Sequence, residues 1–302
     1  MQSPGADSSK NKKVEKVRNY LSLIKFSHTI FALPFALIGF FLAVNSYEGL
    51  TTKVLIQKFV LVIACMVTAR SAAMAFNRYL DRHFDALNPR TAVREIPAGV
   101  IAHKHALAFT VLMCILFVVC TYFINRICFY LSPVALFVIL FYSYTKRFTP
   151  LCHLVLGLGL SLAPIGAWLA ITGAFHFLPL LLSFAVIFWV SGFDIIYALQ
   201  DVDFDRSYNL RSIPAALGKG RALQVSKLLH LLSALSILAF GYLGNFGPLF
   251  WFGAFVYAGM LVYQHSLVKP NNLSRVNLAF MTANGIASVV FAVFVIADLY
   301  LQ

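Results

Sequence analysis

The sequence predicts an all-α integral membrane protein, a bundle of nine transmembrane helices. Three observations support this fold class: 60% of the 302 residues are hydrophobic, only 12% are charged, and long apolar runs follow one another from about residue 26 onward. Soluble domains carry about a quarter charged residues, so this composition could not cover a soluble fold with polar side chains. The net charge of +13 would also suit a nucleic-acid partner, but the placement of the basic residues favours a membrane, and no nucleic acid is expected.

The apolar runs give the positions of the helices, because a helix needs about 20 residues to cross a bilayer. They predict helices over residues 26–45, 55–80, 105–124, 128–145, 152–172, 177–200, 222–243, 247–266 and 277–300. Asn125 and Arg126 separate the third helix from the fourth, and Pro164 is expected to kink the fifth. Residues 1–20 are rich in Ser, Lys, Asn and Asp and are predicted to form a polar tail, whereas residues 21–302 are predicted to form one transmembrane domain.

The basic residues predict how the chain is oriented in the membrane. If the N-terminus is cytoplasmic, 20 of the 24 Lys and Arg residues fall on the cytoplasmic side, and only Lys53, Lys58 and Arg126 fall toward the other side. Lys and Arg are enriched in cytoplasmic loops of membrane proteins. This asymmetry supports an odd number of helices and a cytoplasmic N-terminus, as in an inner-membrane protein of the bacterial type.

The acidic residues gather at two places, both on the predicted cytoplasmic side. One place reads Asn77-x3-Asp81-x3-Asp85, and the other reads Tyr197-x3-Asp201-x3-Asp205. A spacing of four residues puts side chains on one face of a helix, so each place presents an oxygen-rich stripe and Asp203 points away from it. Two such stripes can hold Mg²⁺ together with substrate phosphates. The alternative is that these acids are interfacial charges at two helix ends, neutralised by neighbouring arginines.

Basic residues beside the stripes are candidates for binding the remaining phosphate charge, because Arg and Lys bind phosphate through charge-assisted hydrogen bonds. They are Arg78, Arg82, Arg90, Arg94, Lys146, Arg147, Arg206 and Arg211.

Two long stretches of the chain resemble the signatures of the UbiA superfamily of intramembrane prenyltransferases. They are NRYLDRHFDALNPRTAVREIPAG over residues 77–99 and FDIIYALQDVDFDRSYNLRSIPAALG over residues 193–218. The resemblance implies a helical bundle around a lateral cavity, with residues 21–302 as one prenyltransferase domain. It implies Mg²⁺ and diphosphate ligands at Asn77, Asp81, Asp85, Asp201 and Asp205, and substrate contacts at Tyr197, Arg94, Lys146 and Arg147, with Lys25 and Arg211 as further candidates. Arg78 departs from the family, in which many members have Asp, and it should lower the local negative charge.

The stretches KFSHTIFALPFALIGF and RSAAMAFNR are most similar to the 4-hydroxybenzoate polyprenyltransferase branch. This resemblance implies Mg²⁺-dependent transfer of a polyprenyl group from a polyprenyl diphosphate to a hydroxylated aromatic carboxylate, in ubiquinone or menaquinone biosynthesis. An acceptor of 1,4-dihydroxy-6-naphthoate, in the futalosine menaquinone route, is an alternative. A cation-coupled transporter is a second alternative, but it predicts acids near the middle of the bilayer on broken helices. A non-catalytic lipid-binding protein is a third, and it would need no paired acidic stripes.

Two ionisable residues lie inside predicted helices. Arg70 precedes Asn77 by seven residues, and Asp194 precedes Asp201 by seven. Seven residues make about two helical turns, so each lies on the face of its stripe and about 10 Å deeper. One hypothesis is that they mark the acceptor pocket, with Arg70 binding a carboxylate and Asp194 acting catalytically by orienting the hydroxyl or taking its proton. The other is that they form a structural ion pair between two helices.

Overall fold

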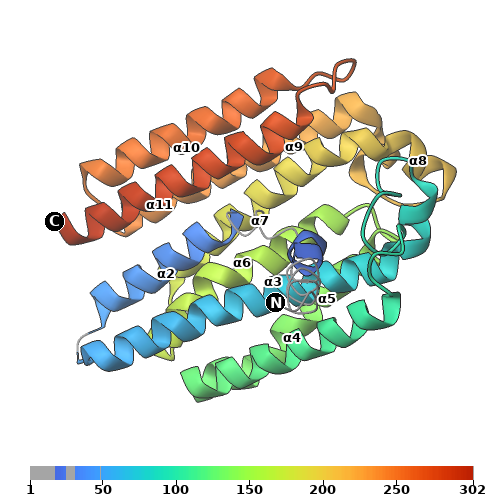
Figure 1. Ribbon diagram of the computed structural model, residues 1–302. Coiled ribbons are helices and arrows are strands. Elements are labelled where there is room, and N and C mark those ends of the chain that lie inside the picture. Colours follow the sequence, from blue (N-terminus) through green and yellow to red (C-terminus); the bar gives the residue numbers. More distant parts are fainter. Residues whose placement is uncertain (1–17, 25–30, 48, 302) are drawn as a thin grey trace, which may run out of the picture.

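The computed structural model describes residues 18–24, 31–47 and 49–301, and this part of the chain is a bundle of long helices (Figure 1). After a helical turn at residues 18–23, the long helices are α2 (Leu33–Ser46), α3 (Thr52–Leu87), α4 (His103–Ile124), α5 (Arg126–Thr145), α6 (Cys152–Thr172), α7 (Phe177–Ala198), α9 (Ile213–Leu243), α10 (Pro248–Leu267) and α11 (Asn284–Leu301). Short elements are the 3₁₀ turn η2 (Leu199–Asp201), α8 (Val202–Ser207) and the π-helical turn η3 (Leu278–Ala283). The predicted fold class is confirmed.

The number of membrane spans agrees with the prediction only approximately. Within the described ranges, 7 helices are long and apolar enough to cross a membrane, and α2 is a shorter apolar helix of 14 residues. The break between α4 and α5 falls at Asn125 as predicted, and the Asn125 side chain accepts a hydrogen bond from the Cys128 amide at the start of α5.

Three helix boundaries differ from the prediction. Helix α2 begins at Leu33 instead of residue 26. Element α9 begins at Ile213, where Ser212 caps it and Pro214 suits its first turn, but Gly218 (φ 78°) interrupts it, so the long helix that follows starts close to the predicted residue 222. Helix α3 continues to Leu87 instead of ending near residue 80, so the first acidic stripe is helical throughout.

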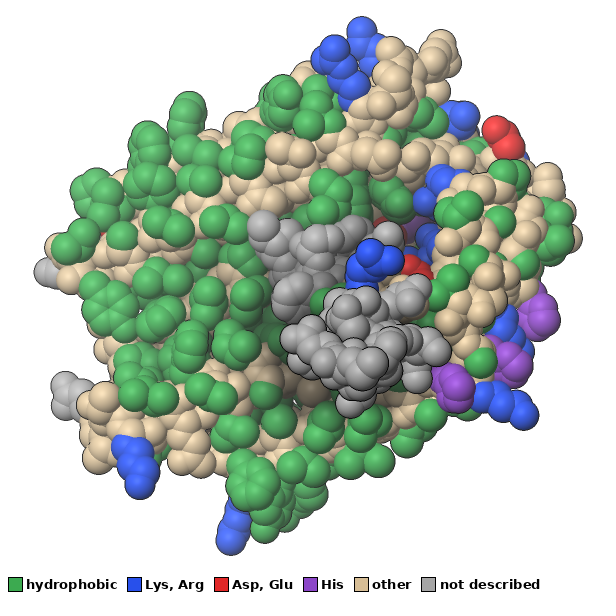
Figure 2. Space-filling model, in the orientation of Figure 1, with side chains coloured by type: hydrophobic (Ala, Val, Ile, Leu, Met, Phe, Trp, Pro, Cys, Tyr) green, Lys and Arg blue, Asp and Glu red, His purple; other side chains and the backbone are tan. Residues whose placement is uncertain are grey.

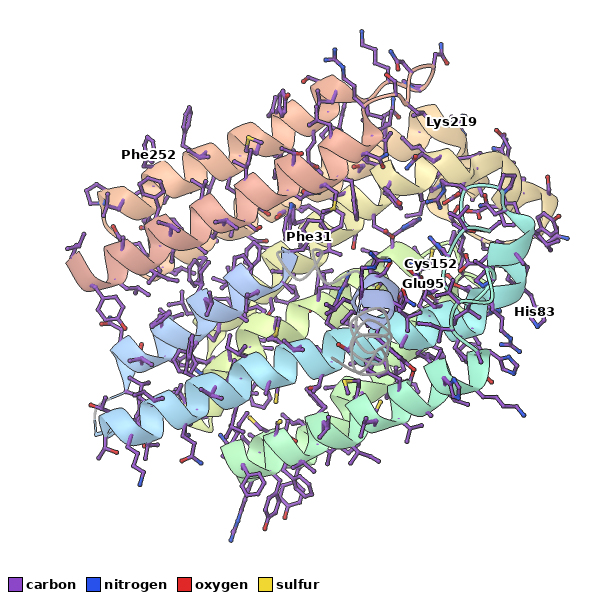
Figure 3. All side chains as sticks on the ribbon, in the orientation of Figure 1. Phe31, His83, Glu95, Cys152, Lys219 and Phe252 are labelled. Atoms are coloured by element: carbon purple, nitrogen blue, oxygen red, sulfur yellow. The ribbon has the colours of Figure 1, made fainter. Side chains whose placement is uncertain are left out.

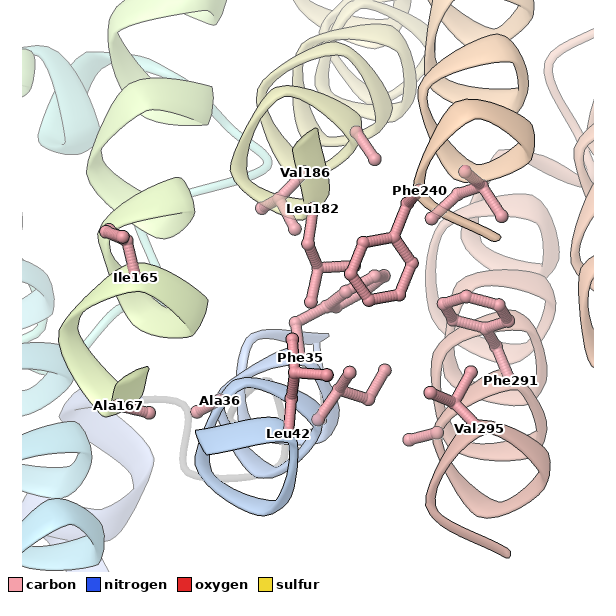
Figure 4. Packing of buried hydrophobic residues seen from close by; sticks show 14 of the residues in the cluster. Phe35, Ala36, Leu42, Ile165, Ala167, Leu182, Val186, Phe240, Phe291 and Val295 are labelled. Carbon is pink, nitrogen blue, oxygen red and sulfur yellow. The ribbon is translucent and has the colours of Figure 1, made fainter. Parts of the chain in front are cut away.

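Aromatic and aliphatic side chains from α2, α6, α7, α9, α10 and α11 form the core, part of which is seen in Figure 4. Phe35, Leu182, Phe240 and Phe291 are fully buried within it. The outer surface is also hydrophobic over most of the face in Figure 2, and Phe252 on α10 points outward in Figure 3. A chain that is apolar both inside and outside is suited to a lipid environment.

Helices α2 and α6 approach closely where Gly39 faces Pro164. A Cβ atom at Gly39 would lie 2.2 Å from the Pro164 carbonyl oxygen. Gly39 therefore sets the distance between these helices, and α6 remains one helix across Pro164.

Gly39→Ala is expected to lower the free energy of unfolding by about 1–3 kcal/mol, because an added methyl group overpacks this contact. Gly259→Ala is the matched control, since a Cβ there meets nothing within 4 Å and Gly259 is also helical. Thermal unfolding of the two variants in detergent should show a lower Tm for Gly39→Ala only. An unchanged Tm for Gly39→Ala would mean that α2 can move away from α6 at little cost.

The connections after α3, α5 and α7 all lie at one end of the bundle, where α8 is labelled in Figure 1. This arrangement brings the two acidic stripes to the same end, although they are far apart in the sequence.

Candidate functional site

A polar cavity of about 580 Å³ lies at this end, lined by α3, α5, α6, α7 and their connections. Figure 2 shows acidic and basic side chains within the hollow there. Among the described lining residues, the acids are Asp81, Asp85, Glu95, Asp194, Asp201 and Asp205. The cations are Arg70, Arg78, Arg90, Arg94, Lys146 and Arg147, so the formal charges of this lining balance.

The first acidic stripe lies in the cavity wall on the last turns of α3. The Asn77 side-chain amide donates to Asp81 Oδ2 at 3.0 Å. Arg147 Nη2 lies 3.0 Å from Asp81 Oδ1, and Arg94 Nη1 lies 2.6 Å from Asp85 Oδ1. Because the helix is regular to Leu87, the four-residue spacing puts these oxygens side by side.

The second stripe does not follow one continuous helical face as predicted. The chain tightens into the 3₁₀ turn η2 before α8, which breaks the α-helical register after Tyr197. Asp201 and Asp205 nevertheless both line the cavity and are buried, while Asp203 is exposed. Asp203 thus points away from the cavity, in agreement with the prediction.

Cations from other segments pair with the second stripe. Arg90 Nη2 and Nε contact the two Asp201 oxygens at 2.6 and 3.1 Å, a bidentate geometry. Lys146 Nζ lies 2.7 Å from Asp205 Oδ1, and the Ser212 hydroxyl donates to Asp205 Oδ2 at 2.8 Å. The second stripe is thereby joined through Arg90 to the connection after α3, and through Lys146 to the connection after α5.

The two loop cations keep their charge in this setting. Burial alone would lower the pKa of Lys146, but the neighbouring Asp205 carboxylate outweighs it and the pKa is raised. The pKa of Arg90 is likewise raised, because Asp201 outweighs the effect of burial. Both side chains therefore remain cationic at neutral pH.

Arg90 and Asn88 contact the second stripe more directly than the sequence suggested. Arg90 was expected only as one of several basic neighbours, yet its Nη1 also donates to the Tyr197 hydroxyl at 3.1 Å. Asn88 donates to Asp201 Oδ1 at 3.3 Å. Asn88 ends α3 in an extended conformation, as a residue before proline does, and this turns Arg90 back over the cavity. The Asn-Pro-Arg sequence that follows the first stripe was the available signal.

Arg70 and Asp194 both line the cavity, but they do not form the structural ion pair considered above. Asp194 Oδ2 instead contacts His153 Nδ1 at 2.7 Å, which makes the predicted Arg70–Asp194 pair wrong. Arg70 Nε is buried without a hydrogen-bond partner among the described residues. His153 was not predicted, because a lone histidine at the start of an apolar helix carries no motif.

Two predicted substrate-binding residues are not part of the described cavity wall. Arg211 is exposed and outside the lining, so its expected substrate contact is corrected. Its guanidinium donates to the Phe148 carbonyl at 2.9 Å and its amide to the Lys146 carbonyl at 2.7 Å, which fastens the turn between α5 and α6. Lys25 lies outside the described residues.

Several polar atoms in the wall have no hydrogen-bond partner within the described structure. Asp85 Oδ2 and two guanidinium nitrogens of Arg78 are buried in this state, and Arg78 is only 4% exposed. Buried polar groups are normally satisfied, so such atoms mark a place for a ligand. No group of three or more His, Cys, Asp or Glu residues in the described ranges could hold a metal ion. The wall fits Mg²⁺ shared with phosphate oxygens better than a metal held by protein ligands alone.

A second, mainly apolar chamber of about 330 Å³ lies between α3, α4, α5 and α6. It shares Arg70, Tyr142, Leu156 and Leu160 with the polar cavity. The two spaces therefore meet at Arg70, with charged walls on one side and hydrocarbon walls on the other.

Comparisons with known proteins agree with this architecture. The model of the UbiA prenyltransferase family matches residues 32–286. The 4-hydroxybenzoate octaprenyltransferase of Tolumonas auensis is 34% identical over 170 residues, which cover 56% of this chain and 59% of that protein. The enzyme of that name from Actinobacillus pleuropneumoniae serotype 5b is 32% identical over 185 residues, 61% of this chain and 62% of that one. The matched segments thus span less than two thirds of these curated relatives.

Solved structures share the fold over nearly the whole chain. A UbiA homologue from Aeropyrum pernix K1, solved without ligand, is 30% identical with a TM-score of 0.76, covering 91% of this chain and 97% of that one. A UbiA homologue from Archaeoglobus fulgidus bound to DMAPP and Mg²⁺ is 20% identical with a TM-score of 0.71, covering 94% of this chain and 100% of that one. With the family match across most of its length and these shared helices, this chain belongs to the UbiA prenyltransferase family.

Proposed function

We propose that this protein is a Mg²⁺-dependent aromatic prenyltransferase that moves a polyprenyl group from its diphosphate to a hydroxylated aromatic carboxylate of the 4-hydroxybenzoate type, in ubiquinone or menaquinone biosynthesis. The observation that carries the proposal is the junction of a charged cavity and an apolar chamber at Arg70. A prenyl diphosphate has the same two parts, a charged head and a hydrocarbon tail. The names of the curated relatives support an aromatic acceptor of this type.

The charged cavity is suited to the diphosphate head. Asp81, Asp85, Asp201 and Asp205, with Asn77, would hold Mg²⁺, as the Mg²⁺-bound Archaeoglobus fulgidus homologue suggests for this fold. When bound, the metal supplies positive charge to the departing diphosphate oxygens. Arg94, Lys146 and Arg147 would exchange contacts with the aspartates for contacts with phosphate oxygens. The unpaired guanidinium nitrogens of Arg78 would also donate to phosphate oxygens.

The apolar chamber is suited to the prenyl tail. Its walls include Val62, Leu131, Val138 and Ile165, and Phe117 and Phe175 also line it. Dry walls keep water away from an allylic carbon that becomes carbocation-like as the diphosphate leaves.

The reaction breaks two bonds, carbon–oxygen and carbon–hydrogen, and forms two, carbon–carbon and the bond of the proton to a base. A carbon of the acceptor ring attacks the allylic carbon, and the carbon–oxygen bond to diphosphate breaks with its electron pair leaving on the diphosphate. The ring proton then passes to a base. Arg70 would bind the acceptor carboxylate, and Asp194, which lines the same cavity, would act as that base.

Transfer of a radiolabelled polyprenyl diphosphate by the purified protein in detergent tests the proposal. The acceptors should include 4-hydroxybenzoate and 1,4-dihydroxy-6-naphthoate, and labelled product is expected with an acceptor of this class when Mg²⁺ is present. The absence of product with every aromatic acceptor would refute the proposed function. A cation-coupled transporter is less favoured, because the paired acids lie at one end of the bundle.

We also propose that this end faces the cytoplasm, because most Lys and Arg residues lie toward it. In a cysteine-free background, cysteines replacing the exposed His105 and Ser207 should react with an impermeant maleimide from the cytoplasmic side. A cysteine replacing the exposed Lys53, in the first turn of α3, should react only from the other side. Labelling of His105→Cys and Lys53→Cys from the same side would contradict this orientation.

A further inference from the structure

His153 occupies an unusual position at the start of α6. It is only 2% exposed, and it contacts two other helices, α7 and α9. Its Nδ1 lies 2.7 Å from Asp194 Oδ2 on α7. The backbone amide of Ile213, at the start of α9, donates to its Nε2 at 3.4 Å. The Ser191 hydroxyl donates to its carbonyl oxygen at 3.1 Å. In Figure 3 its neighbour Cys152 is labelled at the cavity.

The contact with Asp194 orients both side chains. An ionised carboxylate can only accept, so Nδ1 of His153 is the donor in this contact. His153 therefore holds one oxygen of Asp194 in place. The Asp194 side chain is 24% exposed and lines the cavity, so the carboxylate keeps a side open to a ligand.

The partner of Asp194 differs in kind from the partners of the other cavity aspartates. Asp81, Asp85, Asp201 and Asp205 are each paired with an arginine or a lysine. Those cations are 24–34% exposed on long, flexible side chains, whereas the His153 side chain is only 3% exposed. Within the described cavity wall, Asp194 is thus held in one orientation by a buried partner.

We infer that His153 is a positioning residue for proton removal in the proposed transferase reaction. It fixes Asp194 so that the open side of the carboxylate receives the proton from the ring carbon that has bonded to the prenyl group. The electron pair of that carbon–hydrogen bond restores the aromatic ring. The protonated Asp194 then gives its proton to the released diphosphate or to water in the cavity. This inference rests on the proposed function.

The test compares substitutions that keep or remove the donor at the Nδ1 position. The Asn amide can occupy the place of Nδ1, so His153→Asn should keep kcat within a few-fold of wild type. His153→Leu has no donor, and its kcat should fall by about 10²-fold with little change in either KM, as expected for loss of base catalysis. His105→Leu is the matched control, because His105 is exposed and outside the cavity.

A kinetic isotope effect separates positioning from simple damage to the fold. With an acceptor deuterated at the prenylated ring carbon, His153→Leu should show a larger isotope effect on kcat than wild type or His153→Asn, because proton removal becomes rate-limiting. Reduced folding would lower the active fraction without changing this ratio. If His153→Leu does not fold, His153→Gln replaces it, because its amide reaches toward Ile213 instead of the Nδ1 position.

Two outcomes would overturn the inference while leaving the proposed function intact. One is that His153→Leu, which lacks the donor, has the same kcat as His153→Asn. The other is that its kcat falls but its isotope effect stays at the wild-type value. A wild-type protein that prenylates no aromatic acceptor would instead refute the proposed function itself.

Discussion

Replacing Asp81, Asp85, Asp201 or Asp205 by alanine is expected to lower kcat by about 10²-fold or more, as for the loss of an electrostatic group that stabilises developing charge. Each aspartate lies in the cavity wall and is paired with a cation from another segment. Its removal would take away an oxygen ligand for Mg²⁺ and leave an arginine or lysine without its partner. The measurement is the rate of labelled product formation at saturating donor and acceptor.

The control for this series is Asp203→Ala, since Asp203 is in the same segment but exposed. It should retain most activity. A chelator of divalent cations should abolish the wild-type activity, and added Mg²⁺ should restore it. If Asp203→Ala were as inactive as Asp201→Ala, the loss would reflect damage to α8 and not the removal of a metal ligand.

Arg70→Ala is expected to raise the KM for an aromatic carboxylate by about 10- to 100-fold, the range expected for hydrogen bonds to a charged group. The KM for the prenyl diphosphate should change little, because the diphosphate head would bind at the aspartates and not at Arg70. Arg70 Nε is buried without a hydrogen-bond partner in the described structure, so a ligand carboxylate would satisfy it. Steady-state kinetics with each substrate varied in turn measure the two KM values.

An acceptor that lacks the carboxylate provides the internal control, because wild type and Arg70→Ala should use it equally. Arg82→Ala is the matched variant on the same helix, since Arg82 donates to the Tyr79 carbonyl and does not line the cavity. An equal rise in both KM values for Arg70→Ala would show that the acceptor carboxylate binds elsewhere.

The sequence predicted the fold well because the relevant signals are local. Apolar runs and the polar pair Asn125–Arg126 located most helices to within a few residues. The short helical piece from Ile213 to the break at Gly218 was missed because the predicted span was placed by hydropathy, whereas Ser212 and Pro214 begin this piece before the apolar part. The pairing of α2 with α6 depends on Gly39, and no local pattern reports such a contact.

The site was predicted where spacing on one helix was enough. The stripe from Asn77 to Asp85 depends only on α3 remaining helical, and it does. Contacts between different segments could not be predicted from the spacing of residues along one helix. Arg90 is close in sequence to the first stripe but binds Asp201 of the second, and Asp194 pairs with His153 instead of Arg70. Such choices depend on how three connections fold over one cavity, which a single sequence does not encode in its local spacing.

The balance of six acids and six cations around the cavity has a consequence for how the substrate arrives. A lining without net formal charge adds little long-range attraction of its own, so the attraction of this end for an anion comes from the Lys and Arg residues outside the cavity. The donor would reach the site by diffusing in the plane of the bilayer, carried by its hydrocarbon tail. The encounter rate would then follow the mole fraction of donor among the lipids.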